Sequence, residues 1–206
     1  MRVAILGGTG AFGRALAASL TRLGEDVVLG SRDPQRASEL AAVLGVDGKA
    51  NADAAADAEL VVLSVPSRAA LPTARDLAGR IGDTPLLCVA SDLRFTDNGV
   101  EPGRDSRSLA EEVADLLEGP VASGYQSLAA ASLLQPTPPD EDVFVCGDDP
   151  AAKEPALALG ARLVGGRAID AGPLANSRGL EAMTSVLLNI NRTYGAHAGF
   201  RVTGLP

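Results

Sequence analysis

Three glycines near the N-terminus have the spacing of a phosphate-binding turn. Gly8, Gly10 and Gly13 form the pattern G-x-G-x-x-G, after an apolar run at residues 3–6 and before leucines at helical spacing. A strand, a tight turn and a helix in this order leave free backbone N–H groups at the helix start, where the helix dipole favours anions. We expect Gly8 to permit the sharp turn, Gly10 to let a pyrophosphate approach the backbone, and Gly13 to let the helix pack on the strand. The pattern predicts a dinucleotide site; a glycine turn without a ligand is the alternative.

The residues after the second expected strand, 26–30, bear on the choice of dinucleotide. An NAD site usually has an acidic side chain here, bonded to the ribose hydroxyls. This chain has Ser31 and Arg32, and Arg36 lies on the same side if the next helix begins at Pro34. A hydroxyl and a guanidinium fork suit a ribose 2′-phosphate. Asp33 would oppose the phosphate unless it turns away as a helix cap. The pattern favours NADP, and a solvated helix face is the alternative for the two arginines.

The protein has few of the side chains that usually carry the proton in dehydrogenases. His197 is the only histidine, and Lys49 and Lys153 are the only lysines. Tyr125 is followed four residues later by Ala129, so a Tyr-x-x-x-Lys pair is absent. Dehydrogenases of alcohols or hydroxy acids need a positioned proton carrier, usually His, Lys or Tyr.

The two cysteines lie apart from any metal-binding pattern. Cys88 and Cys146 sit in separate apolar runs, and neither has ligand spacing to His197, so we expect no metal site. One reaction needs neither a metal nor a strong protein acid: hydride transfer between two cofactors, for which the protein supplies proximity and orientation.

Alternating strands and helices indicate the fold. Further strands are expected at residues 46–50, 59–65, 85–90, 120–124, 143–147 and 168–172, with helices at 34–44, 52–58, 69–80, 108–117, from 150 and at 174–194. This alternation predicts a doubly wound parallel sheet. Residues 91–107 are expected to form an extended surface loop where such sheets bind ligands. The proline-rich stretch 127–142 suggests a boundary between two domains, 1–126 and 127–206, and the tail 199–206 should be extended.

Composition excludes several classes of function. The 206 residues carry a net charge of −8 and only 3% aromatic residues, which argues against nucleic-acid binding. No apolar stretch reaches the length of a membrane span, and no signal peptide is recognised. We therefore expect a cytoplasmic protein with small buried cysteines and no membrane partner.

Several stretches resemble one family, the NADPH-dependent reductases of coenzyme F420. The opening residues 1–10 and residues 30–34 carry a generic part of the resemblance, and three later stretches are more specific: 145–149, 170–178, and 188–192 leading to 196–199. The resemblance covers nearly the whole chain. It implies a Rossmann-type doubly wound sheet, residues 1–126, with a small C-terminal α/β lobe, residues 127–206, that completes a cleft for the deazaflavin.

The resemblance also implies an activity and a site. Hydride passes directly between NADP(H) and the deazaflavin coenzyme F420, in a protein that is usually a homodimer. Gln126 and Leu128 match the catalytic positions. The positions that match the NADP contacts are Gly8, Thr9, Gly10, Phe12, Gly13, Ser31, Arg32, Arg36, Val65 and Pro66.

Two stretches depart from the family pattern. Gln126 stands where the family typically has histidine, and it can donate a hydrogen bond but cannot become cationic. Ser91 and Asp92 replace a proline-containing turn. These changes leave two alternatives open: an NADPH-dependent reductase of another small acceptor (imine, flavin or pathway intermediate), or a non-catalytic NADP-binding sensor. Candidates for binding an anionic deazaflavin tail are Arg94, Arg104, Arg107, Arg178 and Arg192.

Overall fold

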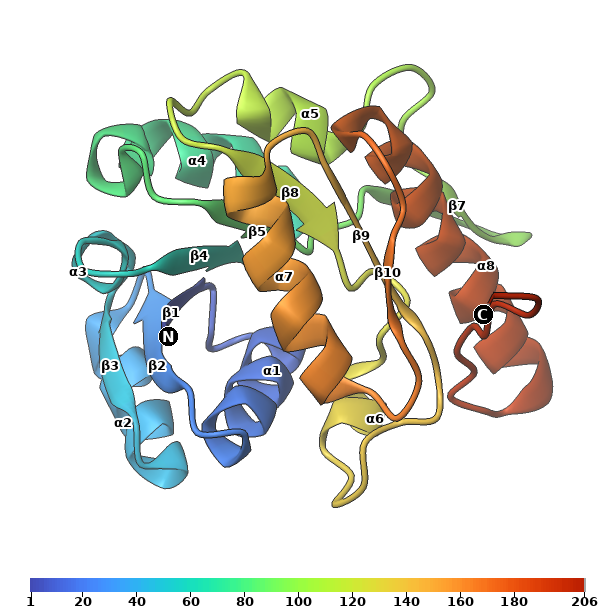
Figure 1. Cartoon of the computed structure of the whole chain (residues 1–206), viewed down its shortest axis with the longest axis horizontal. Coiled ribbons are helices and arrows are strands. Elements are labelled where there is room, and N and C mark those ends of the chain that lie inside the picture. The colour runs from blue at the N-terminus through green and yellow to red at the C-terminus, as the bar shows by residue number, and fades with distance from the viewer. Residues whose placement is uncertain (206) are drawn as a thin grey trace.

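One eight-stranded sheet forms the centre of the protein. The structure is a computed structural model that describes residues 1–205, and Figure 1 shows its strands in the order β10-β9-β8-β5-β4-β1-β2-β3. Their bounds are β1 Arg2–Leu6, β2 Asp26–Ser31, β3 Asp47–Ala50, β4 Leu60–Leu63, β5 Leu86–Cys88, β8 Val121–Gly124, β9 Val143–Gly147 and β10 Ala168–Asp170. The predicted doubly wound sheet is confirmed, and the chain reverses its direction of travel between β1 and β4.

The sheet is parallel except at one place. Strands β1 to β5 and β8 run in one direction, whereas β9 pairs antiparallel with β8, and β10 is parallel to β9. The predicted parallel arrangement thus holds for β1 to β5 and β8, whereas β9 and β10 run in the opposite direction. After β8 the chain returns through only a four-residue helix, α6 Ala130–Leu133, and a proline-rich loop. Because no long helix crosses the sheet here, the next strand enters from the same end.

Helices cover both faces of this sheet (Figure 1). Two buried apolar clusters lie on its faces, one formed with α1, α2 and α7 and the other with α3, α4 and α5. The helices are α1 Ala11–Arg22, α2 Pro34–Leu44, α3 Asn51–Ala55, α4 Ser67–Ile81, α5 Leu109–Ala114, α7 Pro150–Leu163 and α8 Ser177–Tyr194, the last preceded by a 3₁₀ turn, Leu174–Asn176. All four residues of β4 are buried, as expected for a central parallel strand. No helix among residues 1–205 combines the length and apolarity that a membrane crossing requires.

Short polar side chains fix where the helices begin. The Asp33 carboxylate accepts from the Arg36 N–H at the start of α2, which confirms Asp33 as a cap. Ser108 and Glu111 form a reciprocal capping box at α5. Asp149 accepts from Ala151 N–H before α7. Asp33, the acidic residue beside the expected phosphate site, therefore has a structural role as a helix cap.

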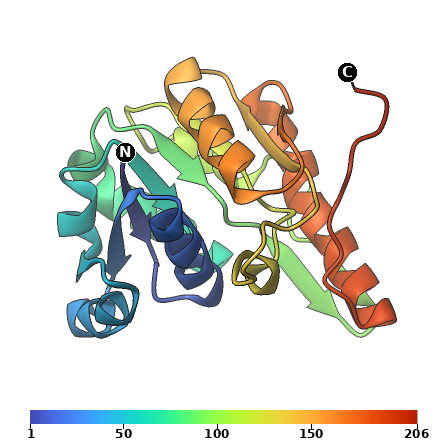
Figure 2. The ribbon, with the colours of Figure 1, turned by 60° about the horizontal axis from the view of Figure 1, so that its bottom comes forward.

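Residues 91–107 contain a β-hairpin and not the expected extended loop. Its strands are β6 Leu93–Thr96 and β7 Gly99–Pro102, and Figure 2 shows it beside α8, away from the main sheet. Asn189 of α8 accepts from Val100 N–H at 3.0 Å and donates to Val100 O at 2.7 Å. The dipeptide Asn98-Gly99 is the local signal that could have predicted this turn.

The C-terminal tail is fastened although it has no regular structure up to residue 205; Pro206 lies outside the described residues. Asp142 is buried, donates its N–H to Phe200 O, and accepts from Val202 N–H at 2.8 Å. Burial alone would raise the pKa of Asp142, but the bonds from Val202 and from Arg167 lower it to about 2. Strands β9 and β10 belong to the main sheet, which therefore runs across the expected boundary at residue 126; that boundary stays a prediction.

Candidate functional site

The turn after β1 depends on two neighbouring glycines. Gly7 has φ +79°, in the region that favours glycine, so the turn needs a glycine at position 7 as well as the predicted Gly8. Gly8 donates its N–H to Ile5 O at 3.1 Å and to Gly30 O at 3.0 Å. A Cβ on Gly8 would lie 2.6 Å from the Leu29 side chain, so Gly8 holds the turn against β2.

The other two glycines of the pattern differ in what surrounds them. A Cβ on Gly13 would lie 2.8 Å from Gly8 Cα, which confirms that this glycine lets α1 pack directly on the turn. A Cβ on Gly10 would meet only Gly7 O, at 3.3 Å, and Gly10 is exposed. Gly10 caps α1 without a side-chain hydrogen bond, so no cap side chain accepts from the first N–H groups of the helix. Close packing therefore requires glycine at position 13, whereas the role of Gly10 in cofactor binding stays a prediction.

A cavity of about 240 Å³ lies beside this turn. It is bounded by the segments after β1, β4 and β5, where the strand order reverses and open α/β sheets bind ligands. Four predicted contact residues meet here, namely Gly10, Phe12, Val65 and Pro66. The cavity is also lined by Ala11, Ser64, Val89 and Ala90. The structure thus brings together the turn and the predicted nicotinamide end.

The predicted 2′-phosphate contacts lie at the end of β2. Ser31 is buried, and its Oγ accepts from Asp33 N–H at 3.1 Å, which leaves the hydroxyl proton to be donated. Arg32 and Arg36 are exposed, and within residues 1–205 neither forms an ion pair. Thr9 is half-buried in the glycine turn. Their roles in NADP binding stay predictions, and their donors are available for it.

Gln126 lies after β8 and is 7% exposed. Its Nε2 donates to Cys88 O at 3.2 Å and to Ser123 Oγ at 2.8 Å, both within the protein. The hydrogen bonds that this amide can donate are therefore made inside the protein, and the role of Gln126 toward a second substrate stays a prediction. Its Oε1 is buried and has no hydrogen-bond partner among the described residues.

A small cavity of about 60 Å³ brings Gln126 and Leu128 together with α8 and the tail. Thr184 of α8 donates to Gln126 O at 3.1 Å, and its hydroxyl pairs with that of Ser91 at 2.9 Å. Asn191 accepts from Ala198 N–H at 2.7 Å. The cavity is lined by Gln126, Ser127, Leu128, Ala129, Thr184, Leu187, Leu188, Asn191 and Ala198. Asn191 falls within a stretch that carries the family resemblance, whereas no sequence signal marked Thr184.

Most of the arginines expected to bind an anionic tail already have partners. Arg94 pairs with Glu101, Arg107 with Asp115, and Arg104 with both Asp92 and Glu112. Arg178 donates to the carbonyl oxygens of Asp105 and Ser106. Arg192 is exposed and takes part in no ion pair of the described chain. Among the five arginines, Arg178 and Arg192 therefore have positive charges that no carboxylate of the described residues neutralises.

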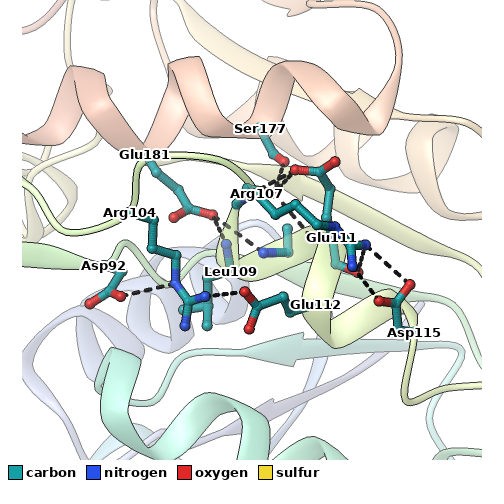
Figure 3. A network of polar contacts seen from close by, with 11 residues as sticks. Asp92, Arg104, Arg107, Leu109, Glu111, Glu112, Asp115, Ser177 and Glu181 are labelled. Carbon is teal, nitrogen blue, oxygen red and sulfur yellow. Dashed lines mark hydrogen bonds and ion pairs between the residues drawn. The ribbon is translucent and has the colours of Figure 1, made fainter.

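A buried carboxylate joins α8 to the helix after the hairpin. Figure 3 shows Glu181 of α8 accepting from the N–H of Leu109, at 2.8 Å, near the Arg104 cluster. It also accepts from Ala110 N–H at 3.3 Å. Burial raises the pKa of Glu181 to about 7, although these bonds and the Arg104 charge act in the opposite direction. This carboxylate links α8 to the start of α5.

The fold and the glycine turn define a class before any comparison is made. A doubly wound sheet with a G-x-G-x-x-G turn at its switch point is the architecture of dinucleotide-dependent oxidoreductases. The sequence profile of one family, described as NADP oxidoreductase coenzyme F420-dependent, matches residues 2–87. The chain is 35% identical over its full length to the F420-dependent NADP reductase of Methanothermobacter thermautotrophicus and 34% identical to that of Methanocaldococcus jannaschii, covering 96% and 99% of those proteins. The protein belongs to this family, as its motifs predicted.

Solved structures agree with this assignment. A candidate F420-dependent NADP reductase from an Arthrobacter species superimposes with a TM-score of 0.88 and 28% identity, over 99% of this chain and 100% of that one. An imine reductase from Streptomyces aurantiacus matches with a TM-score of 0.65 and 22% identity over 94% of this chain and 61% of its own. The similarity to the imine reductase shows a shared fold and nothing about activity.

Exchanging Gly10 and Gly13 separately for alanine should distinguish their roles. Gly13→Ala should lower the free energy of unfolding by about 1–3 kcal/mol, because its Cβ meets backbone atoms that cannot move aside. Gly10→Ala should change stability little but weaken NADPH binding about tenfold or more. Urea unfolding and fluorescence titration with NADPH measure the two effects. Equal loss of stability in both variants would contradict the assignment.

Glu181→Gln should remove a pH dependence of stability. The folded protein keeps the proton of Glu181 up to about pH 7, whereas the unfolded chain releases it near its ordinary value of 4.5. The stabilisation is therefore full below pH 4.5 and is lost as the pH rises through 7, a fall of roughly 3 kcal/mol. Glu181→Gln should show a smaller fall in urea unfolding between pH 5 and 8, while the exposed Glu154→Gln keeps the wild-type slope. If the free energy of unfolding falls equally with pH in all three proteins, Glu181 is not the cause of the pH dependence.

Proposed function

We propose that this protein transfers a hydride between NADP(H) and the deazaflavin coenzyme F420. The observation that carries this proposal is full-length identity of 34–35% to reductases named for that reaction. NADPH loses a hydride from its nicotinamide ring, the deazaflavin ring gains it, and one proton comes from solvent, so that NADP⁺ and the reduced deazaflavin result. The reverse direction balances in the same way.

The cavity of about 240 Å³ beside the glycine turn suits the nicotinamide cofactor. The α1 N-terminus and Gly10 would hold the pyrophosphate, because backbone N–H groups point there and no Cβ intervenes. Ser31, Arg32 and Arg36 would hold the 2′-phosphate and so select NADP over NAD. Val65 and Pro66 would border the nicotinamide end. Each role is a proposal supported by the position of the residue.

The absence of ionisable side chains around both cavities supports direct hydride transfer. The described residues that line them include no Asp, Glu, His, Lys, Arg, Cys or Tyr. Burial raises the pKa of Cys88 to about 12, and His197 is exposed. Reduction of an imine or a carbonyl needs a proton carrier at the substrate, whereas a deazaflavin accepts the hydride as such. The chain thus contributes proximity, orientation and exclusion of water.

We also propose that the protein is a cytoplasmic homodimer with a deazaflavin cleft between residues 1–126 and 127–206. Two cysteines that are both buried and unpaired support a reducing compartment. Exposed apolar side chains on the hairpin and on α8, such as Phe95, Val186 and Tyr194, support a subunit contact. Sedimentation of the purified protein measures its state of association.

Mixing the protein with NADPH and the oxidised deazaflavin tests the reaction. The visible absorbance of the deazaflavin should fall as it is reduced, and the nicotinamide absorbance should fall with it in equal molar amounts. Flavin mononucleotide and a cyclic imine serve as alternative acceptors in the same assay. Reduction of either alternative, with no change in the deazaflavin at high protein concentration, would exclude the proposal.

Arg32→Ala should weaken NADP binding far more than NAD binding. The guanidinium bonds a phosphate that NAD lacks, and a charge-assisted bond contributes about 1.5–3 kcal/mol, which corresponds to a 10- to 100-fold rise in Kd for NADP. Arg80→Ala, at an exposed position of α4, is the matched control and should leave both affinities unchanged. Equal loss of NADP and NAD affinity in Arg32→Ala would rule out the 2′-phosphate contact.

A further inference from the structure

The backbone directly before Gln126 is strained. Tyr125 has φ +72° and is the one non-glycine residue among those described with a positive φ. Its ring is buried, and its hydroxyl donates to Ala156 O at 2.5 Å, so tertiary contacts hold the residue in this conformation. Such a conformation costs on the order of 1–3 kcal/mol and persists at ligand-binding and catalytic positions. The turn at Tyr125 brings the Gln126 side chain back to the end of β5.

Two acceptors fix the orientation of the Gln126 amide. A backbone carbonyl can only accept, so the amide atom 3.2 Å from Cys88 O must be the nitrogen. The second amide hydrogen goes to Ser123 Oγ at 2.8 Å. Both donors of the amide are thereby used, and Oε1 remains as an acceptor whose position is set by the two bonds.

The acceptor atom has no partner inside the protein. Gln126 Oε1 is buried, and no described residue donates to it; the same holds for Oγ of the next residue, Ser127. A buried polar atom without a partner costs about 1–3 kcal/mol. Both residues line the small cavity, which at about 60 Å³ admits the edge of a ring and no entire ring system. Strain at Tyr125 and two unpaired polar atoms thus occur in three consecutive residues.

We propose that Gln126 is a specificity-determining residue, whose Oε1 accepts a hydrogen bond from a ring N–H of the second substrate. The inference rests on the proposed function, because it assumes that the second substrate enters beside Gln126. A heteroaromatic ring with an imide or lactam N–H at its edge fits this acceptor. A ring with only carbonyl oxygens at that edge would place two acceptors against each other and is selected against.

The imide edge of a deazaflavin has this chemistry, since its N–H lies between two carbonyl groups. Oε1 would take the N–H, and the Ser127 hydroxyl, which can donate as well as accept, would face a neighbouring carbonyl. Thr184, which donates to the Gln126 carbonyl, holds the same segment against α8. Gln126 therefore distinguishes a donor from an acceptor at the edge of the ring, and it needs no positive charge to do so.

Binding of two ligands to two proteins tests this inference without turnover. The probes are a 5-deazaflavin with a free imide N–H and the same compound methylated at that nitrogen, titrated by fluorescence in the presence of NADP⁺. The wild-type protein should bind the N–H compound about tenfold more tightly, the value of one hydrogen bond of about 1.4 kcal/mol. Gln126→Met should lose about tenfold for the N–H compound and discriminate little between the two. Gln135→Met, the same change at an exposed glutamine, should behave as the wild type.

The outcomes separate this inference from the proposed function. Equal wild-type affinity for both compounds overturns the inference but leaves deazaflavin binding intact. An undiminished preference in Gln126→Met also overturns it, because the preference then arises from steric exclusion of the methyl group elsewhere. If the wild-type protein binds neither compound, both proposals fall. Should Gln126→Met not retain NADPH binding, Ser123→Ala replaces it: loss of one clamping acceptor should reduce the discrimination, and unchanged discrimination would count against the proposal.

Discussion

Contact between two glycines of the first turn is the constraint on which the cofactor side depends. A Cβ on Gly13 would lie 2.8 Å from Gly8 Cα, and a Cβ on Gly8 would lie 2.9 Å from Ile5 O, so neither residue can carry a side chain without displacing backbone. This contact seats the start of α1 against the turn after β1, so that the first residues of the helix line the cavity at the switch point. Gly8 also donates to Gly30 O and thereby ties the turn to β2, whose end carries Ser31 and Arg32.

Side chains of α8 hold several other segments in place through hydrogen bonds to their backbone. Asn189 holds the hairpin, Asn191 holds the tail, Thr184 holds the segment after β8, and Glu181 holds the start of α5. All four come from α8, so one helix fastens four segments, and two of these, the segment after β8 and the tail, border the small cavity. This gives a physical reading of the motif at residues 188–192 that marks the family: its asparagines fasten chain segments together.

The two cavities share a chemical property, since no described lining residue is ionisable. The residues that line these cavities cannot deliver a proton at a defined point, which agrees with a reaction in which the protein orients the reacting groups. Specificity at the second ring must then come from hydrogen-bond polarity and shape. Gln126, clamped between Cys88 and Ser123, supplies one fixed acceptor for that purpose.

The NADP half could be predicted from the sequence because its parts are consecutive. Strand, glycine turn and helix follow one another without interruption over residues 2–22, and Asp33 caps the helix that directly follows it. Even so, the residue with positive φ proved to be Gly7, since several glycines in a row satisfy the same pattern. The hairpin was missed although Asn98-Gly99 marks its turn, and β9 runs antiparallel because its connection crosses no face of the sheet. Only the tertiary structure decided what Gln126 offers to a ligand: the carbonyl that orients its amide belongs to Cys88, 38 residues earlier, and hydrogen bonds between distant segments leave no trace in local residue patterns.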